Sequence, residues 1–144
     1  MRKSILFLLI PFVIQSCNSS GGYKDVMDEV LKVHDKVMMD SELAIRNRMK
    51  LDTLSSNLSS LAKTKPNLDT LQASKKIQQL KAELDTADSR MNAWMQGFEV
   101  EPGKRSNDEA VAYYKEEGKK IKALDSLFQK AIKQSDDFLN EIKK

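Results

Sequence analysis

The chain of 144 residues carries 24 Lys and Arg against 21 Asp and Glu, a formal net charge of +3. Two of the basic residues, Arg2 and Lys3, belong to the N-terminal segment treated next; 24 less these two leaves 22, close to the 21 acidic residues. The charges are interleaved along the rest of the chain, which is typical of a solvated helix surface and argues against nucleic-acid binding. Cys17 is the only cysteine, so an internal disulfide is excluded.

Residues 1–16 have the pattern of a signal peptide. Arg2 and Lys3 precede an apolar run over residues 5–14, which is long enough for a signal peptide but too short to cross a bilayer, since a spanning helix needs roughly 20 apolar residues. The run ends in Ile14-Gln15-Ser16-Cys17, which resembles the lipobox of bacterial lipoproteins. That resemblance implies removal of residues 1–16 and a covalent diacylglycerol or acyl lipid on Cys17. The alternative is an ordinary secretory signal that leaves a free thiol.

The segment after the lipobox predicts where the anchored protein resides. Residues 17–22 would form the lipidated cysteine and a short Ser/Gly-rich tether. The tether lacks the acidic run that is linked to surface display in some Bacteroidota lipoproteins. These residues leave open which membrane and which side the anchor occupies; of the alternatives, we expect the periplasmic face of the outer membrane.

Apolar periodicity predicts a first helix over residues 23–62. Val26, Val30, Val33 and Val37 are spaced by four and three residues, which places them on one helix face. The stripe weakens at residues 40–42, where we expect a bend. It resumes through Ala44, Ile45, Met49, Leu51, Leu54, Leu58 and Leu61. Pro66 then predicts a break, because proline disfavours helix at the residue before it.

Two further helices follow, over residues 69–97 and 107–142. The second has a seven-residue apolar repeat of the coiled-coil kind, at Ala73, Ile77, Leu80, Leu84, Ala87, Met91, Trp94 and Phe98. The third begins with a predicted capping box between Ser106 and Glu109. Its stripe is Ala110, Tyr114, Glu117, Ile121, Leu124, Phe128, Ala131, Ser135, Phe138 and Ile142.

The short connections between these helices favour antiparallel neighbours. Residues 23–144 are therefore predicted to form one all-α domain, an elongated up-down-up three-helix bundle with coiled-coil-like heptads. A homo-oligomer that buries leftover apolar surface is left open.

This topology brings several chemically distinctive residues to one end of the bundle. The set is His34, Met38, Met91, Trp94, Met95, Phe98, Tyr113 and Tyr114. Thioethers and an imidazole suit Cu(I) or Ag(I), so His34, Met38, Met91, Met95 and Trp94 form one hypothetical ligand set. The plainer interpretation is core packing, since Met and aromatic residues at heptad spacing usually fill cores. A third interpretation makes Phe98, Tyr113 and Tyr114 part of a partner-binding end.

Three segments carry a resemblance to a known family. Residues 34–38 (HDKVM), 84–98 (LDTADSRMNAWMQGF) and 109–117 (EAVAYYKEE) resemble a group of small Bacteroidota lipoproteins often labelled "viral A-type inclusion protein". Members often have a Pro and a further Met after the first segment, where this chain has Met39 and Ser41. That departure weakens a shared metal site that needs the extra thioether. The resemblance implies a lipoprotein and brings no established activity with it.

The residue types of the mature chain favour a non-enzymatic function. The chain has one His and no Cys nucleophile in the mature part, and no spacing marks its carboxylates as a catalytic set. We therefore expect an envelope lipoprotein that acts as a helical adaptor for a protein partner or the cell wall. Covalent linkage to peptidoglycan through Lys144 is one variant of that hypothesis. The alternative function is periplasmic binding of Cu(I) or Ag(I).

Overall fold

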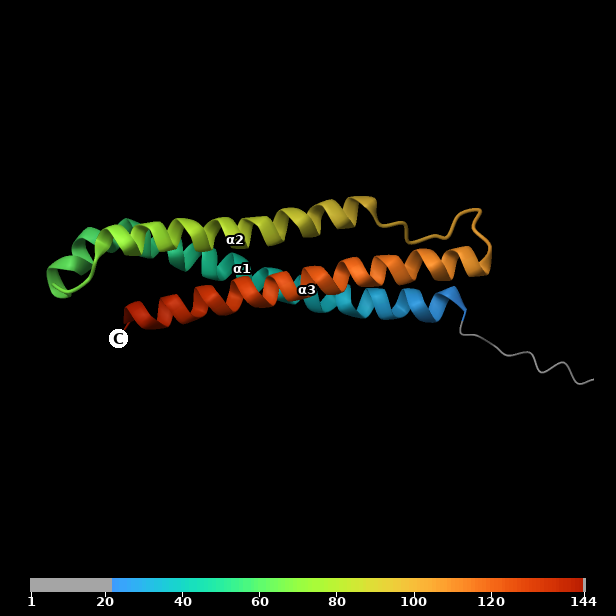
Figure 1. The fold of residues 1–144 in the computed structure, drawn as a ribbon, viewed down its shortest axis with the longest axis horizontal. Helices are drawn as coiled ribbons and strands as arrows, with labels where there is room; N and C mark the ends of the chain where they lie inside the picture. The colour runs from blue at the N-terminus through green and yellow to red at the C-terminus, as the bar shows by residue number, and fades with distance from the viewer. Residues whose placement is uncertain (1–21, 144) are drawn as a thin grey trace, which may run out of the picture.

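The structure is a computed structural model that describes residues 22–143 as three helices joined by short loops (Figure 1). The helices are α1 (Tyr23–Thr64), α2 (Thr70–Gly97) and α3 (Asn107–Lys143). The predicted signal peptide, Cys17, Lys144 and all of the tether except Gly22 lie outside the described residues. Within residues 22–143, no helix is long and apolar enough to cross a membrane.

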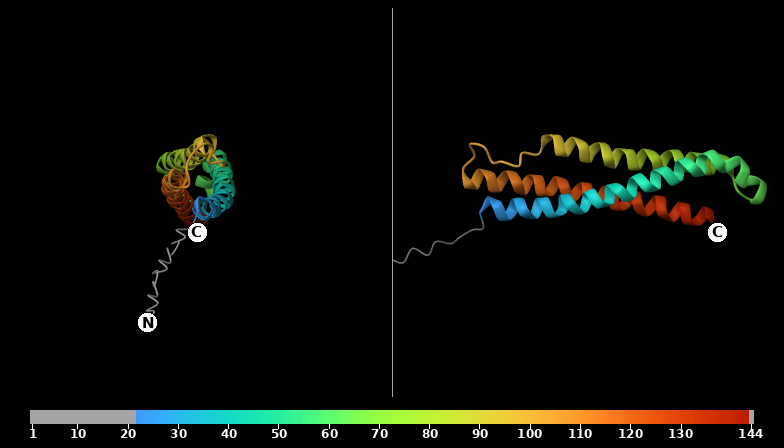
Figure 2. Two further views of the ribbon diagram at one scale, coloured as in Figure 1. Left: turned by 90° about the vertical axis from the view of Figure 1, so that its right-hand side faces the viewer. Right: turned by 180° about the vertical axis from the view of Figure 1, so that it is seen from behind.

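The three helices form an elongated antiparallel bundle, which confirms the predicted all-α fold. Each observed helix boundary lies within two residues of the predicted one. Figure 2 shows that α1 runs beside α3 at the end where α1 begins, and lies closer to α2 where α1 ends. This oblique path matters because it gives the two ends of the bundle different surroundings.

Helix α1 contributes to the core through a strict seven-residue repeat. Its buried apolar residues are Val30, Val37, Ala44, Leu51 and Leu58. The prediction that Ile45 and Met49 belong to this stripe is wrong, because these side chains are 51% and 62% exposed. The other side chains that are buried near Ala44 in this part of α1 are polar, and two of them are described next.

Two polar residues of α1, Asp40 and Asn47, lie in the core seven residues apart. Asn47 donates hydrogen bonds from Nδ2 to Ser135 Oγ at 3.0 Å and to Asp136 Oδ1 at 2.8 Å. Asp40 accepts one from Gln129 Nε2 at 2.7 Å. Because α3 supplies partners for both, α1 continues as one helix through residue 40 and keeps the same face toward the core.

The ends of the helices are fixed by the side chains near them. The predicted capping box is confirmed: the backbone N–H of Ser106 donates to Glu109 Oε2 at 2.8 Å, and that of Glu109 donates to Ser106 Oγ at 3.4 Å. Asp69, which the sequence analysis missed, caps α2 by accepting from the N–H of Gln72 at 2.9 Å. Lys65 donates to the carbonyl of Ile142 at 2.6 Å and so ties the α1–α2 turn to the last turn of α3.

The heptad core predicts a sharp contrast between two leucine-to-alanine substitutions. Leu51 is fully buried, so Leu51→Ala should lower the free energy of unfolding by about 2–5 kcal/mol. Leu71 is 64% exposed, and Leu71→Ala should change it by only about 0.5 kcal/mol. Urea denaturation followed by circular dichroism measures both, and equal costs would contradict the assigned register.

Candidate functional site

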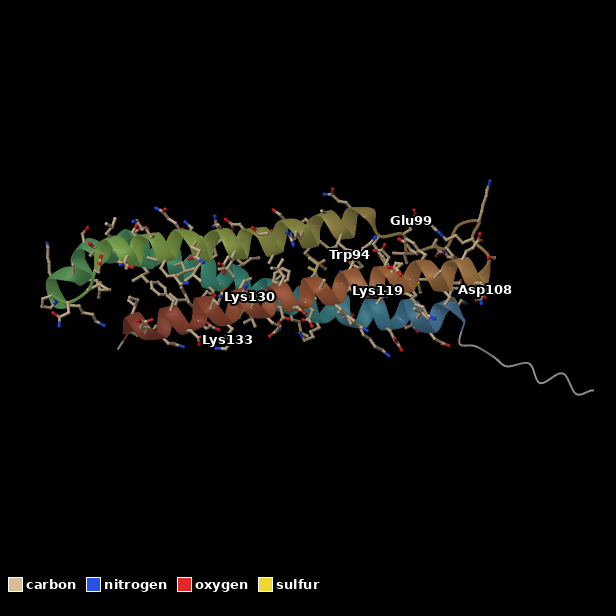
Figure 3. The ribbon with its side chains drawn as sticks, in the orientation of Figure 1. Trp94, Glu99, Asp108, Lys119, Lys130 and Lys133 are labelled. Carbon is tan, nitrogen blue, oxygen red and sulfur yellow. The ribbon has the colours of Figure 1, made fainter. Side chains whose placement is uncertain are left out.

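An aromatic cluster lies where the start of α1, the end of α2 and the start of α3 meet. Trp94 and Glu99 mark this end in Figure 3, near the loop that connects α2 to α3. The Trp94 ring lies 5.9 Å from the His34 ring and 4.7 Å from the Phe98 ring, measured between centroids. Phe98 in turn lies 6.4 Å from Tyr113. These contacts confirm that the predicted stretches of the three helices meet at one end.

Trp94 makes the most buried polar contact of this end. Its indole Nε1 donates to Glu117 Oε2 at 2.8 Å, and Lys120 Nζ lies 2.7 Å from the other carboxylate oxygen. Glu117 is only 5% exposed. The sequence placed Glu117 in the core stripe of α3 but assigned it no partner. The sequence did contain a hint of this contact. A carboxylate at a core position needs a hydrogen-bond donor, and the single Trp of the chain lies on the neighbouring helix.

Tyr113 and Tyr114 of α3 form hydrogen bonds with the backbone of the loop over residues 98–106. Tyr114 Oη donates to the carbonyl of Val100 at 2.7 Å, and burial raises the pKa of Tyr114. Tyr113 Oη accepts from the N–H of Glu99 at 2.8 Å.

Arg105, a residue of the loop itself, also stabilises it. Its guanidinium carbon lies 4.3 Å from the Tyr113 ring centroid, a cation–π contact. Arg105 also pairs with Glu99 at 2.7 Å, and this hydrogen bond lowers the pKa of the Glu99 carboxyl. Phe98, Tyr113 and Tyr114, the predicted partner-binding residues, thus make contacts that close the end of the bundle.

The predicted soft-metal ligands have different surroundings. His34 and Trp94 are neighbours, and His34 Nδ1 lies 3.0 Å from Asp35 Oδ1. Met91 is buried in the core, whereas Met38 and Met95 are 39% and 37% exposed. Within residues 22–143, no group of three or more His, Cys, Asp or Glu side chains could hold a metal ion. The Cu(I) or Ag(I) site stays a prediction from the sequence.

A second candidate surface lies on the outer side of α1, which the apolar pattern did not identify. The described residues include eight large apolar side chains that are exposed, and five of them lie between residues 38 and 49. These five, which we call the α1 apolar surface, are Met38, Met39, Leu43, Ile45 and Met49. Sequence analysis missed this surface because it placed Ile45 and Met49 in the core.

A groove adjoins this surface at the end of the bundle away from the start of α1. It lies between the second half of α1 and the last turns of α3 and encloses about 640 Å³. We call it the distal groove; its lining is Arg46, Met49, Lys50, Thr53, Leu54, Asn57, Leu61, Leu139, Ile142 and Lys143. Half of these residues are apolar, and none is acidic.

Comparisons of the chain with protein-family models, with curated proteins and with solved structures find no match. The resemblance to small Bacteroidota lipoproteins therefore stays a prediction. The features of the described residues that bear on function are the α1 apolar surface, the distal groove and the aromatic end.

The buried Trp94–Glu117 hydrogen bond predicts a coupling that can be measured. Trp94→Phe removes the donor and leaves a buried carboxylate short of one partner, so it should lower the free energy of unfolding by about 1–3 kcal/mol beyond the loss of packing. In a Glu117→Leu background that extra cost should disappear. A double-mutant cycle by urea denaturation gives the coupling energy directly, and equal costs of Trp94→Phe in both backgrounds would contradict the assignment.

Proposed function

We propose that the chain is a lipid-anchored envelope lipoprotein that works as a non-enzymatic helical adaptor and binds a protein partner through α1. The α1 apolar surface carries this proposal. It gathers most of the large exposed apolar side chains of the described residues on one stretch of one helix. Clustered apolar exposure of this kind marks interaction sites, whereas single exposed apolar residues do not.

The chemistry of the polar residues supports an adaptor over an enzyme. Glu117, a buried carboxylate, is occupied by Trp94 and Lys120. His34, the only histidine, lies beside Asp35, whose side chain is 79% exposed. Acid–base or covalent catalysis needs an acid or base that is held close to a nucleophile. In the contacts of residues 22–143, neither Glu117 nor His34 is held in that way.

The lipobox and the tether support the anchor. Cys17 lies five residues before Gly22, where the described chain begins, and α1 starts at Tyr23. An anchor on Cys17 would keep the start of α1 near the membrane and direct the distal groove away from it. Two or more acyl chains are needed for stable anchoring, and the modification implied by the lipobox supplies at least two.

The anchor predicts that fatty-acid labelling depends on Cys17 alone. In cells fed an alkyne-labelled palmitate, the full chain should take up the label and sediment with membranes. Cys17→Ser should lose the label, because serine offers no thiol for the thioether. Ser19→Ala, a tether substitution two residues away, is the matched control and should be labelled normally. Labelling of the Cys17→Ser protein would overturn the anchor.

The adaptor role predicts contact with a partner from the exposed face of α1 and not from the exposed face of α3. We expect a photo-crosslinking amino acid at Met39, Ile45 or Met49 of the full chain in cells to give a discrete protein adduct. The same group at Lys119 or Lys133, two exposed positions of α3 (Figure 3), serves as the control and should give none. An adaptor role would be contradicted if no position gave a protein adduct, or if all gave the same ones.

A further inference from the structure

The distal groove continues the α1 apolar surface along one helical line. Met39 and Leu43 precede Lys50, Leu54 and Leu61 at spacings of four, seven, four and seven residues, which keep one face of a helix. Met39 and Leu43 are exposed, whereas Leu54 and Leu61 are half-buried walls of the groove. From Met39 to Leu61 this line is about 33 Å long, the length of a helix of six turns.

The two uncharged polar side chains on the α1 wall of the groove, Thr53 and Asn57, donate hydrogen bonds to carbonyls of the helix itself. Thr53 Oγ1 donates to the carbonyl of Met49 at 3.0 Å, and Asn57 Nδ2 donates to the carbonyl of Thr53 at 2.8 Å. An apolar ligand therefore does not strip water from unpaired groups when it covers them. The apolar wall of the opposite side comes from Leu139 and Ile142 of α3.

The charged groups along the groove are all basic: Arg46, Lys50 and Lys143. Lys50 donates to the neutral amide oxygen of Asn47 at 3.1 Å, so its charge is not compensated there. Arg46 pairs with Glu42 at 3.3 Å, but both side chains are more than 60% exposed, and such a pair contributes little. The complementary ligand is apolar on one side and carries carboxylates along its edges.

Size and charge select among the occupants that could fill such a groove. A second copy docked groove to groove about a two-fold axis would bring the basic residues of one copy close to the basic residues of the other, and this repulsion disfavours a dimer. A single acyl chain is too slim to cover Met39 and Leu43 as well as the groove. A helix, which is 10–12 Å wide with its side chains, covers both.

We propose that the distal groove binds an acidic amphipathic helix of a protein partner, which lies along α1 from Met39 to Leu61. Its apolar residues contact Leu54, Leu61 and Ile142, and its flanking carboxylates pair with Arg46, Lys50 and Lys143. This is helix-in-groove recognition, in which residues at i, i+3, i+4 and i+7 serve as anchors. The inference rests on the proposed adaptor function and names the chemistry of its partner.

The test uses two model helices with the same leucine face and opposite edges. One peptide has Glu at both edges and its twin has Lys; both are labelled and titrated by fluorescence anisotropy with the full lipidated chain in nanodiscs of zwitterionic lipid. We expect the Glu-edged peptide to bind at least tenfold more tightly than the Lys-edged twin. Lys50→Glu should reduce that preference at least threefold, because only Arg46 and Lys143 then remain basic along the groove. Lys133→Glu, an equal change of charge on an exposed residue outside the groove lining, should leave it unchanged.

Three results would overturn the inference. The first is equal binding, or no binding, of the two peptides. The second is a stable dimer in sedimentation that Leu43→Asp dissociates, which would assign the surface to a second copy. The third is displacement of the Glu-edged peptide by one equivalent of oleate, which would make the groove an acyl-chain site. If crosslinking still yields a partner from α1 while the peptide preference fails, the adaptor function stands and only the groove assignment falls.

Discussion

The seven-residue register of α1 is the constraint on which the rest of the structure depends. It holds through Asp40 and Asn47 because Gln129, Ser135 and Asp136 of α3 supply their hydrogen-bonding partners. If α1 rotated to bury Ile45 and Met49 instead, Asp40 and Asn47 would turn away from their partners on α3, and each hydrogen bond lost would cost about 0.5–1.5 kcal/mol. Buried polar contacts add little to stability compared with apolar packing, but they do select one register. The α1 apolar surface is therefore a consequence of this register: because Asp40 and Asn47 are buried, Ile45 and Met49 are exposed.

The two ends of the bundle differ because α1 crosses from α3 toward α2 along its length (Figure 2). At the first end the aromatic rings stack, Trp94 binds Glu117, and Tyr113 and Tyr114 hold the connecting loop. At the other end α1 leaves the flank of α3 uncovered, and the distal groove lies between them. The hydrogen bond from Lys65 to Ile142 fixes the last turn of α3 there. The groove is thus preformed, which reduces the ordering cost of binding.

Apolar periodicity predicted the helices well where core positions are apolar and failed where they are polar. Every heptad position of α2 from Ala73 to Trp94 is apolar, so its register follows from the sequence alone. In α1 the apolar stripe weakens at residues 40–42, and the sequence predicted that it resumes through Ile45 and Met49; it gave no sign that Asp40 and Asn47 are buried instead. Ser135 in the α3 stripe was the one sign that a polar partner lay opposite. The distal groove could not be predicted, because it depends on the angle at which α1 crosses the other two helices. The spacing of apolar residues along the sequence does not give that angle.

The length of α1 bears on how a basic groove could work on a membrane-anchored protein. With Cys17 anchored as proposed, Arg46 would lie 23 residues along α1 from Tyr23, about 35 Å beyond the start of the helix. Salt screens charge over about 8 Å at physiological ionic strength. Because that distance is several screening lengths, acidic lipid headgroups would attract the groove only weakly when the rod stands away from the bilayer. The carboxylates of a partner helix would then meet Arg46 and Lys50 without competition from the membrane, which is why a long rod suits a groove of this charge.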